Sequence, residues 1–185
     1  MSDWRTKSLD FEEAPYHFEY ATIHDLIEAS RGKEHSLIVA LDHITDVGNF
    51  GAIIRSAEVV GATGVIIPNK RAAQVNETVY RTSAGAVEYL KVAREANISQ
   101  SIARLKHEGF WVGAASVDAK TSLWNAPLEG RLVVVMGAED TGISRLVRES
   151  CDFEFALPQR GFTQSLNVAQ TFAVIAYEWM RHISI

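Results

Sequence analysis

The stretch "SLIVALDHITDVGNFGAIIRSAEVVGATGVIIP" (residues 36–68) decides the fold class of this chain. It begins and ends with short apolar runs rich in β-branched residues, 36–44 and 64–68, which are typical of buried strands. Between them, residues 49–62 carry apolar side chains at helical spacing and end near a glycine. The stretch therefore predicts a strand, a helix and a second strand, all largely buried.

The same alternation continues to the end of the chain. Further strands are expected at 91–96, 110–116, 131–139 and 153–158. Further helices are expected at 23–30, 76–90, 99–109, 144–151 and 165–183. Strands that alternate with helices and are apolar on both faces predict an α/β fold, with a mostly parallel sheet covered by helices on both faces. Ligands of such sheets bind beyond the carboxyl ends of the strands.

Composition sets the broad class. The chain has 185 residues, 47% of them hydrophobic and 22% charged, which suits one globular domain. Residues 1–35 are acidic and are interpreted as a short N-terminal extension of a domain at 36–185. The single cysteine, Cys151, forms no intramolecular disulfide, and neither a signal peptide nor a membrane span is evident. We expect a soluble cytoplasmic protein without a metal site; the net charge of −5 alone argues weakly against a nucleic-acid partner.

Three polar constellations interrupt this apolar pattern. In the first, Asn49 and Gly51 lie where a loop enters a helix, and Arg55 follows Gly51 by one turn. The set suggests a polar site at a strand end. The alternative is that Asn49 caps the helix, Gly51 allows close packing and Arg55 is a solvated charge.

The second constellation, "GAEDTG" (137–142), follows a buried strand and places Glu139 between two glycines. It suits either close approach of the backbone to a ligand or a tight turn with Ser144 as helix cap. The third, 158–167, contains Ser165 as an expected cap and Asn167 in the first helical turn. Asparagine is a poor helix-interior residue, so Asn167 is expected to hold something else.

Other chemistries lack their signatures. The chain contains no G-x-S-x-G elbow and no phosphate-loop lysine. Asp42 and Asp46 could suggest a phospho-acceptor domain, but such a domain needs a late lysine and none follows Lys120.

Together and in this order, the three constellations resemble the SpoU branch of the SPOUT RNA methyltransferases, over about residues 36–183. The similarity is greatest to enzymes that methylate guanosine ribose in bacterial 23S ribosomal RNA. It implies a deep trefoil knot in about 131–185, a homodimer, S-adenosyl-L-methionine as cofactor and RNA, not DNA or a membrane, as partner. Transfer RNA is the second substrate class. A knotted RNA- or ribosome-binding protein without activity is a further alternative, and an α/β protein that binds some other nucleotide, disfavoured by the lack of a phosphate-loop motif, is the last.

The resemblance also implies roles for particular residues. Those that would serve catalysis are Arg55, Asn49, Glu139, Ser165 and Asn167. Those that would contact the cofactor are Gly137, Leu157 and Leu166, with Ala115 and Ser116 as weaker candidates. Residues 68–106 carry a net charge of +4 and could form an RNA-binding face despite the acidic total. Many relatives have proline where Val47 stands.

Overall fold

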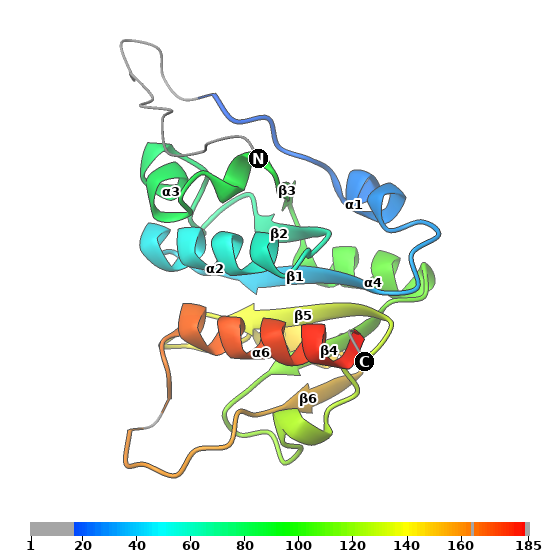
Figure 1. The fold of residues 1–185 in the computed structure, drawn as a ribbon, viewed down its shortest axis with the longest axis vertical. Helices are drawn as coiled ribbons and strands as arrows, with labels where there is room; N and C mark the ends of the chain where they lie inside the picture. Colours follow the sequence, from blue (N-terminus) through cyan, green and yellow to red (C-terminus); the bar gives the residue numbers. More distant parts are fainter. Residues whose placement is uncertain (1–16, 164, 184–185) are drawn as a thin grey trace.

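The computed structural model describes residues 17–163 and 165–183. Its centre is a six-stranded sheet in the order β3-β2-β1-β5-β4-β6, in which every strand pair is parallel (Figure 1). The strands are β1 (Ser36–Asp42), β2 (Gly64–Pro68), β3 (Lys91–Glu95), β4 (Trp111–Ala115), β5 (Arg131–Gly137) and β6 (Phe153–Phe155). The expected mostly parallel α/β sheet is confirmed.

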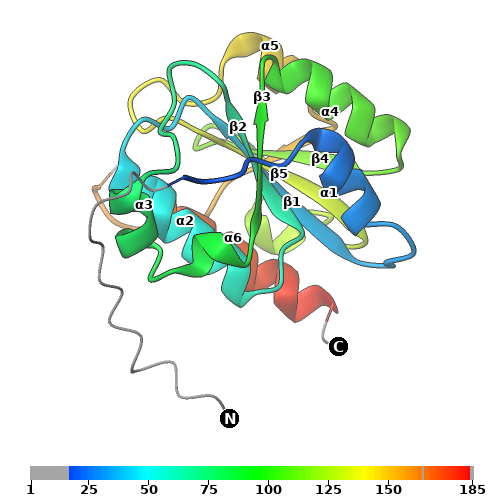
Figure 2. The ribbon, with the colours of Figure 1, turned by 90° about the horizontal axis from the view of Figure 1, so that it is seen from above.

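Helices cover both faces of the sheet. They are α1 (Ile23–Ala29), α2 (Val47–Val59), α3 (Glu77–Thr82), α4 (Ile98–His107), α5 (Arg145–Glu149) and α6 (Val168–Ile183). Figure 2 shows α2, α3 and α6 on one side of the sheet and α1, α4 and α5 on the other. Two short 3-10 turns, η2 (Ala86–Glu88) and η3 (Leu123–Asn125), complete the described elements.

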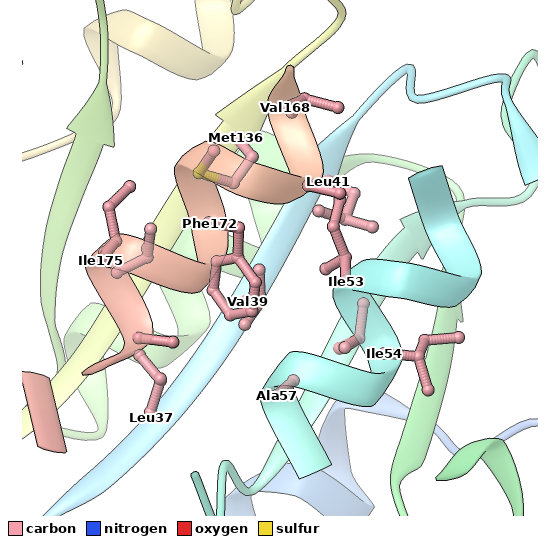
Figure 3. Packing of buried hydrophobic residues seen from close by; sticks show 14 of the residues in the cluster. Leu37, Val39, Leu41, Ile53, Ile54, Ala57, Met136, Val168, Phe172 and Ile175 are labelled. Carbon is pink, nitrogen blue, oxygen red and sulfur yellow. The ribbon is translucent and has the colours of Figure 1, made fainter. Parts of the chain in front are cut away.

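The central strand β1 divides the hydrophobic core. All of its residues are buried, and alternate side chains enter opposite layers. On one side, Val39 packs with Ile53 of α2 and Phe172 of α6 (Figure 3). On the other side, Ile38 packs with residues of α1 and α4. Burying one such side chain stabilises the fold by about 1.5–3 kcal/mol, so both layers favour this central position of β1.

The segment before β1 packs onto the sheet. Thr22 caps α1 with a reciprocal pair of bonds to Asp25. Leu26 of α1 is fully buried in the second core layer, and Ala21 pairs with Ala93 beside β3. The described part of the expected extension therefore shares the core of the sheet.

Several expected boundaries were wrong. The helix expected at 76–90 ends at Thr82, because Ala84 and Gly85 adopt positive φ values of 53° and 80° before η2. Left-handed residues cannot continue a right-handed helix. The last helix begins at Val168, not at residue 165, and β6 ends at Phe155, not at 158.

Candidate functional site

The three polar constellations converge at the carboxyl ends of β1 and β5. Asn167 donates through Nδ2 to Oδ1 of Asn49 at 2.8 Å and to Oε1 of Glu139 at 2.8 Å. Asn49 lies in the first turn of α2, Glu139 follows β5, and Asn167 precedes α6. One amide thus joins segments that lie 118 and 28 residues away along the chain.

Asn167 is also the cap of α6. Its Oδ1 accepts the backbone N–H groups of Ala169 at 2.9 Å and Gln170 at 3.3 Å. Since these groups only donate, the amide oxygen must face the helix and the amide nitrogen must face Asn49 and Glu139. The expectation that Ser165 caps this helix was wrong, because Ser165 is exposed and lies two residues before the capping position.

Glu139 is held at the start of α6. Besides the Asn167 amide, its Oε1 accepts the Val168 N–H at 3.2 Å. A carboxylate at a helix N-terminus is favoured by the unpaired N–H groups and by the helix dipole. The second carboxylate oxygen, Oε2, forms no hydrogen bond with a residue in the described ranges. Glu139 is therefore fixed through one oxygen and keeps the other free for a ligand.

The two glycines around Glu139 form a tight turn. Gly142 has φ +67° and donates its N–H to Ala138 at 2.8 Å. A Cβ on Gly137 would come 2.5 Å from the Gly142 carbonyl oxygen, so only glycine fits there. The tight-turn interpretation is confirmed, and the turn presents Glu139. Ser144 stands at the cap position of α5, but its side chain forms no cap bond.

A pocket of about 220 Å³ opens beside this network. Its lining residues are Ile44, Thr45, Asp46, Asn49, Ala138, Glu139, Asp140 and Val168. Sequence reasoning missed Thr45 and Asp140 as pocket residues, although both adjoin the constellations it chose. Asp46 caps α2, accepting the Asn49 N–H at 2.6 Å, and this overturns the alternative that Asn49 itself is the cap. The lining is rich in acceptors, which suits a ligand that donates hydrogen bonds.

Arg55 remains outside this pocket. It is exposed on α2 and forms no hydrogen bond or ion pair with any residue of the described chain. Gly51, one turn earlier, faces α3: a Cβ there would lie 2.8 Å from Thr82 Cβ and 3.0 Å from the Ser83 nitrogen. Gly51 thus allows close packing, as the alternative interpretation of this constellation had it. Arg55 is a free guanidinium on the same helix as Asn49.

The expected cofactor residues follow neighbouring strands. Ala115 ends β4, Gly137 ends β5, and Leu157 comes two residues after β6, so all three lie at the same edge of the sheet. Ser116 donates its N–H to Phe155 at 2.9 Å. Leu157 is half-buried, and Leu166 is 49% exposed. None of these residues lines the pocket beside Glu139, here called the acidic pocket because Asp46, Glu139 and Asp140 line it. Their role as cofactor contacts stays a prediction.

Three of the titratable groups with shifted pKa values, Arg148, Cys151 and Glu154, lie near α5 and β6. Arg148 binds both carboxylate oxygens of Glu154, at 2.9 and 2.5 Å, and this lowers the pKa of Glu154. Burial raises the pKa of the Cys151 thiol to about 12, so the thiol is protonated at neutral pH.

Within residues 17–163 and 165–183, no cluster of His, Cys, Asp or Glu side chains could hold a metal ion. No helix in these ranges is long and apolar enough to cross a membrane.

Known proteins are similar to this chain in sequence and fold. The model of the SpoU rRNA Methylase family matches residues 36–177. A protein of Staphylococcus haemolyticus assigned to the TrmH family of tRNA/rRNA methyltransferases is 37% identical over 91% of this chain and 67% of its own length. The Bacillus subtilis protein YacO, assigned to the same family, is 37% identical over 89% of this chain and 66% of its own.

Solved structures of methyltransferases are similar to this chain in fold. The SpoU methyltransferase AviRb from Streptomyces viridochromogenes, in complex with the cofactor AdoMet, superposes with a TM-score of 0.78 at 27% identity, covering 87% of this chain and 66% of AviRb. The AdoMet-bound rRNA methyltransferase from Sinorhizobium meliloti gives a TM-score of 0.80 at 27% identity, covering 89% and 62%. The chain thus spans about two thirds of the length of these proteins.

Proposed function

The chain belongs to the SpoU rRNA methylase family, and from this premise we propose that it transfers a methyl group from S-adenosylmethionine to a ribose 2′-hydroxyl of RNA. The observation that carries the proposal is the junction of Asn49, Glu139 and Asn167 beside an acceptor-lined pocket. Relatives named as tRNA/rRNA methyltransferases, and neighbours crystallised with AdoMet, support the reaction class.

The loop between β6 and α6 fits a cofactor held mainly by backbone groups. In the described part of residues 157–166, the main chain forms no backbone–backbone hydrogen bond. Free N–H and C=O groups at a strand end can bind adenosine and a polar tail without charged side chains. Bound there, S-adenosylmethionine would supply an activated methyl group on a sulfonium. The residues that would hold it are Gly137, Leu157 and Leu166, with Ala115 and Ser116 from the β4 end.

The path of the chain supports the proposed knot. β6 lies at one edge of the sheet, whereas α6 packs against α2 and β5 near the centre (Figure 1). The segment between them must therefore return across the carboxyl edge, past the turn that presents Glu139. We place the trefoil knot in about residues 131–185, where it would bring these loops together around one ligand.

The acidic pocket suits the nucleophile. A ribose hydroxyl must be oriented and must lose its proton during transfer. Glu139 Oε2 and the Asn49 side chain can orient that hydroxyl, with Ser165 as a further contact from the loop. Arg55 is always protonated and so is a poor base. It would instead grip an RNA phosphate and stabilise the developing alkoxide, while the proton passes to that phosphate or to a water.

A basic loop anchored beside the pocket supports an RNA substrate. The Ala73 N–H binds the carbonyl of Ile44, a pocket residue, at 2.7 Å, which anchors the loop at 69–76 to the site. Lys70 and Arg71 are both exposed there and pair with no acidic residue of the described chain. Arg71 has a positive φ of 56°, an uncommon conformation for a residue other than glycine, which surrounding contacts must hold. Such held cations suit phosphate groups next to the target nucleotide.

The substrate class follows from the acceptor group. A 2′-hydroxyl exists in RNA and not in DNA, so RNA is the partner. Ribosomal RNA, with guanosine as the modified nucleoside, is our first choice, and transfer RNA is the second. The corresponding cellular location is the cytoplasm.

An exposed groove on α6 supports a homodimer. It has a volume of about 500 Å³ and is lined by Trp124, Ala173, Val174, Tyr177, Glu178 and Arg181. Trp124 and Tyr177 are 53% and 52% exposed, a large apolar area for the surface of a lone subunit. A second copy would bury these rings. Sedimentation velocity should show a dimer that Tyr177→Glu dissociates, and a monomeric wild-type protein would contradict this arrangement.

Cofactor binding and methyl incorporation test the function. Calorimetry should show one S-adenosylmethionine bound per chain, and label from methyl-labelled cofactor should enter RNA extracted from a strain that lacks the protein. A non-catalytic RNA-binding relic would bind RNA but take up little cofactor and transfer no label. That outcome would replace methyl transfer with the binding alternative.

A further inference from the structure

Asp42 is a buried carboxylate that the proposed mechanism does not use. It ends β1 and is only 1% exposed. Its Oδ2 accepts the Ser144 N–H at 2.6 Å, and its Oδ1 binds His43 Nδ1 at 2.7 Å. Burying an ionised carboxylate is costly unless hydrogen bonds compensate it. With both oxygens engaged by the protein, Asp42 is not a free phospho-acceptor, in agreement with the absence of a late lysine.

The bond to Ser144 closes the turn that carries Glu139. Asp42 lies beside Gly137 in the register of β1 and β5, so it is adjacent to the start of that turn. Ser144 is at the end of the same turn, where α5 begins. Between these two anchors, Glu139 is exposed at the tip of the turn. Asp42 therefore joins both ends of the turn to the central strand.

The backbone of the neighbouring His43 is strained in this arrangement. His43 has φ +63°, a left-handed conformation that is uncommon for residues other than glycine. Such residues persist only where the surrounding contacts hold them. Here the imidazole bond to Asp42 is the contact that accompanies the strained backbone.

We propose that Asp42 is a positioning residue: through the Ser144 N–H it fixes the 137–144 turn, so that Glu139 meets Asn167 in one geometry. This inference rests on the proposed methyl transfer, in which Glu139 orients the ribose hydroxyl. A turn free to move at its Ser144 end would leave Glu139 exposed but misplaced. Misplacement of a reacting group by about 1 Å can cost about 100-fold in rate.

Two Asp42 variants separate the hydrogen bond from the charge. Asp42→Ala removes the acceptor and should lower kcat by about 100-fold, while the KM for RNA changes by less than about 3-fold because the 69–76 loop is untouched. Asp42→Asn keeps an oxygen for the Ser144 N–H and an NH₂ group for His43. It should recover most of the lost kcat. An Asn variant as impaired as the Ala variant would overturn the positioning role.

A variant of the donor tests the same bond from the other side. Ser144 has φ −60° and ψ 147°, values that proline adopts readily, so Ser144→Pro removes the N–H and places the ring Cδ against Asp42 Oδ2, which forces the two groups apart. The double variant should have a kcat close to that of the worse single variant, because both changes break one interaction. Two independent losses that multiply would contradict a shared bond. Should Asp42→Ala fail to fold, a wild-type kcat in Ser144→Pro decides against the proposal.

Hydrogen exchange gives a readout that needs no catalysis. By mass spectrometry, peptides covering 138–150 should exchange faster in Asp42→Ala than in wild type, while peptides of α2 and of the 69–76 loop keep their rates. Unchanged exchange at 138–150 would overturn the role of Asp42 even if kcat falls. If the wild-type protein transfers no methyl group, the proposed function fails, and the exchange data still decide whether Asp42 fixes the turn.

Discussion

Replacing Asn167 should separate helix capping from site assembly. Its Oδ1 caps α6 through Ala169 and Gln170, whereas its Nδ2 joins Asn49 to Glu139. Asn167→Ser keeps a capping oxygen and loses the two amide donations. Asn167→Ala loses the capping oxygen as well as the two amide donations. The pair is therefore a matched comparison in which only the cap differs.

The magnitudes follow from these contacts. Serine caps helices about as well as asparagine, and alanine costs typically about 1 kcal/mol at this position. The two amide hydrogen bonds lie at an exposed site. We therefore expect their loss to lower the free energy of unfolding by about 1 kcal/mol in both variants. Asn167→Ala should thus be about 1 kcal/mol less stable than Asn167→Ser. Methyl transfer should fall by about 100-fold in both, because both leave Glu139 and Asn49 unjoined.

Two assays decide the case. Urea denaturation followed by circular dichroism gives the free energies of unfolding, and single-turnover transfer from labelled S-adenosylmethionine gives the chemical rate. Equal rates with unequal stabilities would support separate functions for the two halves of the amide. If Asn167→Ser transfers methyl groups at the wild-type rate, the amide junction is not needed and the reasoning fails.

Three further outcomes are expected. Arg55→Ala should abolish methyl transfer in the labelled-RNA assay while calorimetry shows nearly unchanged cofactor affinity, and joint loss of both would contradict its role toward RNA. Gly137→Ala should lower the free energy of unfolding by about 1–3 kcal/mol in urea titrations, because the added methyl would strike the Gly142 backbone; wild-type stability would show that the turn yields. Because Arg148 lowers the pKa of Glu154, the pair stabilises the fold above the ordinary glutamate pKa of about 4.3 and stops doing so as the pH falls through the lowered value. The stability difference between wild type and Glu154→Gln should accordingly shrink in acid denaturation, and a difference that grows on acidification would refute that sign.

The sheet was predictable because its information is local. Each strand is a short run of apolar, often β-branched residues, and the buried run of β1 is apolar on both faces, which parallel strands between helix layers require. The helix expected at 23–30 also depends on local contacts, because Thr22 and Asp25, which cap its start, lie within one helical turn.

The details of the site were less predictable because they depend on distant partners. Sequence alone favoured Ser165 as the cap of α6, and the structure gives that place to Asn167, whose other contacts come from Asn49 and Glu139 far along the chain. The packing of Thr82 against Gly51 of α2 likewise joins segments far apart along the chain. Local propensity carries no record of either contact.

The position of the transferred methyl group tests the account most directly. RNA methylated by the protein with labelled S-adenosylmethionine would be digested to nucleosides and separated by mass spectrometry. We predict that the label is found in a nucleoside that carries the methyl group on its ribose, and that Asn167→Ser lowers its yield. Label on a base, or no label in RNA while the protein binds the cofactor, would contradict the claim that this pocket activates a 2′-hydroxyl.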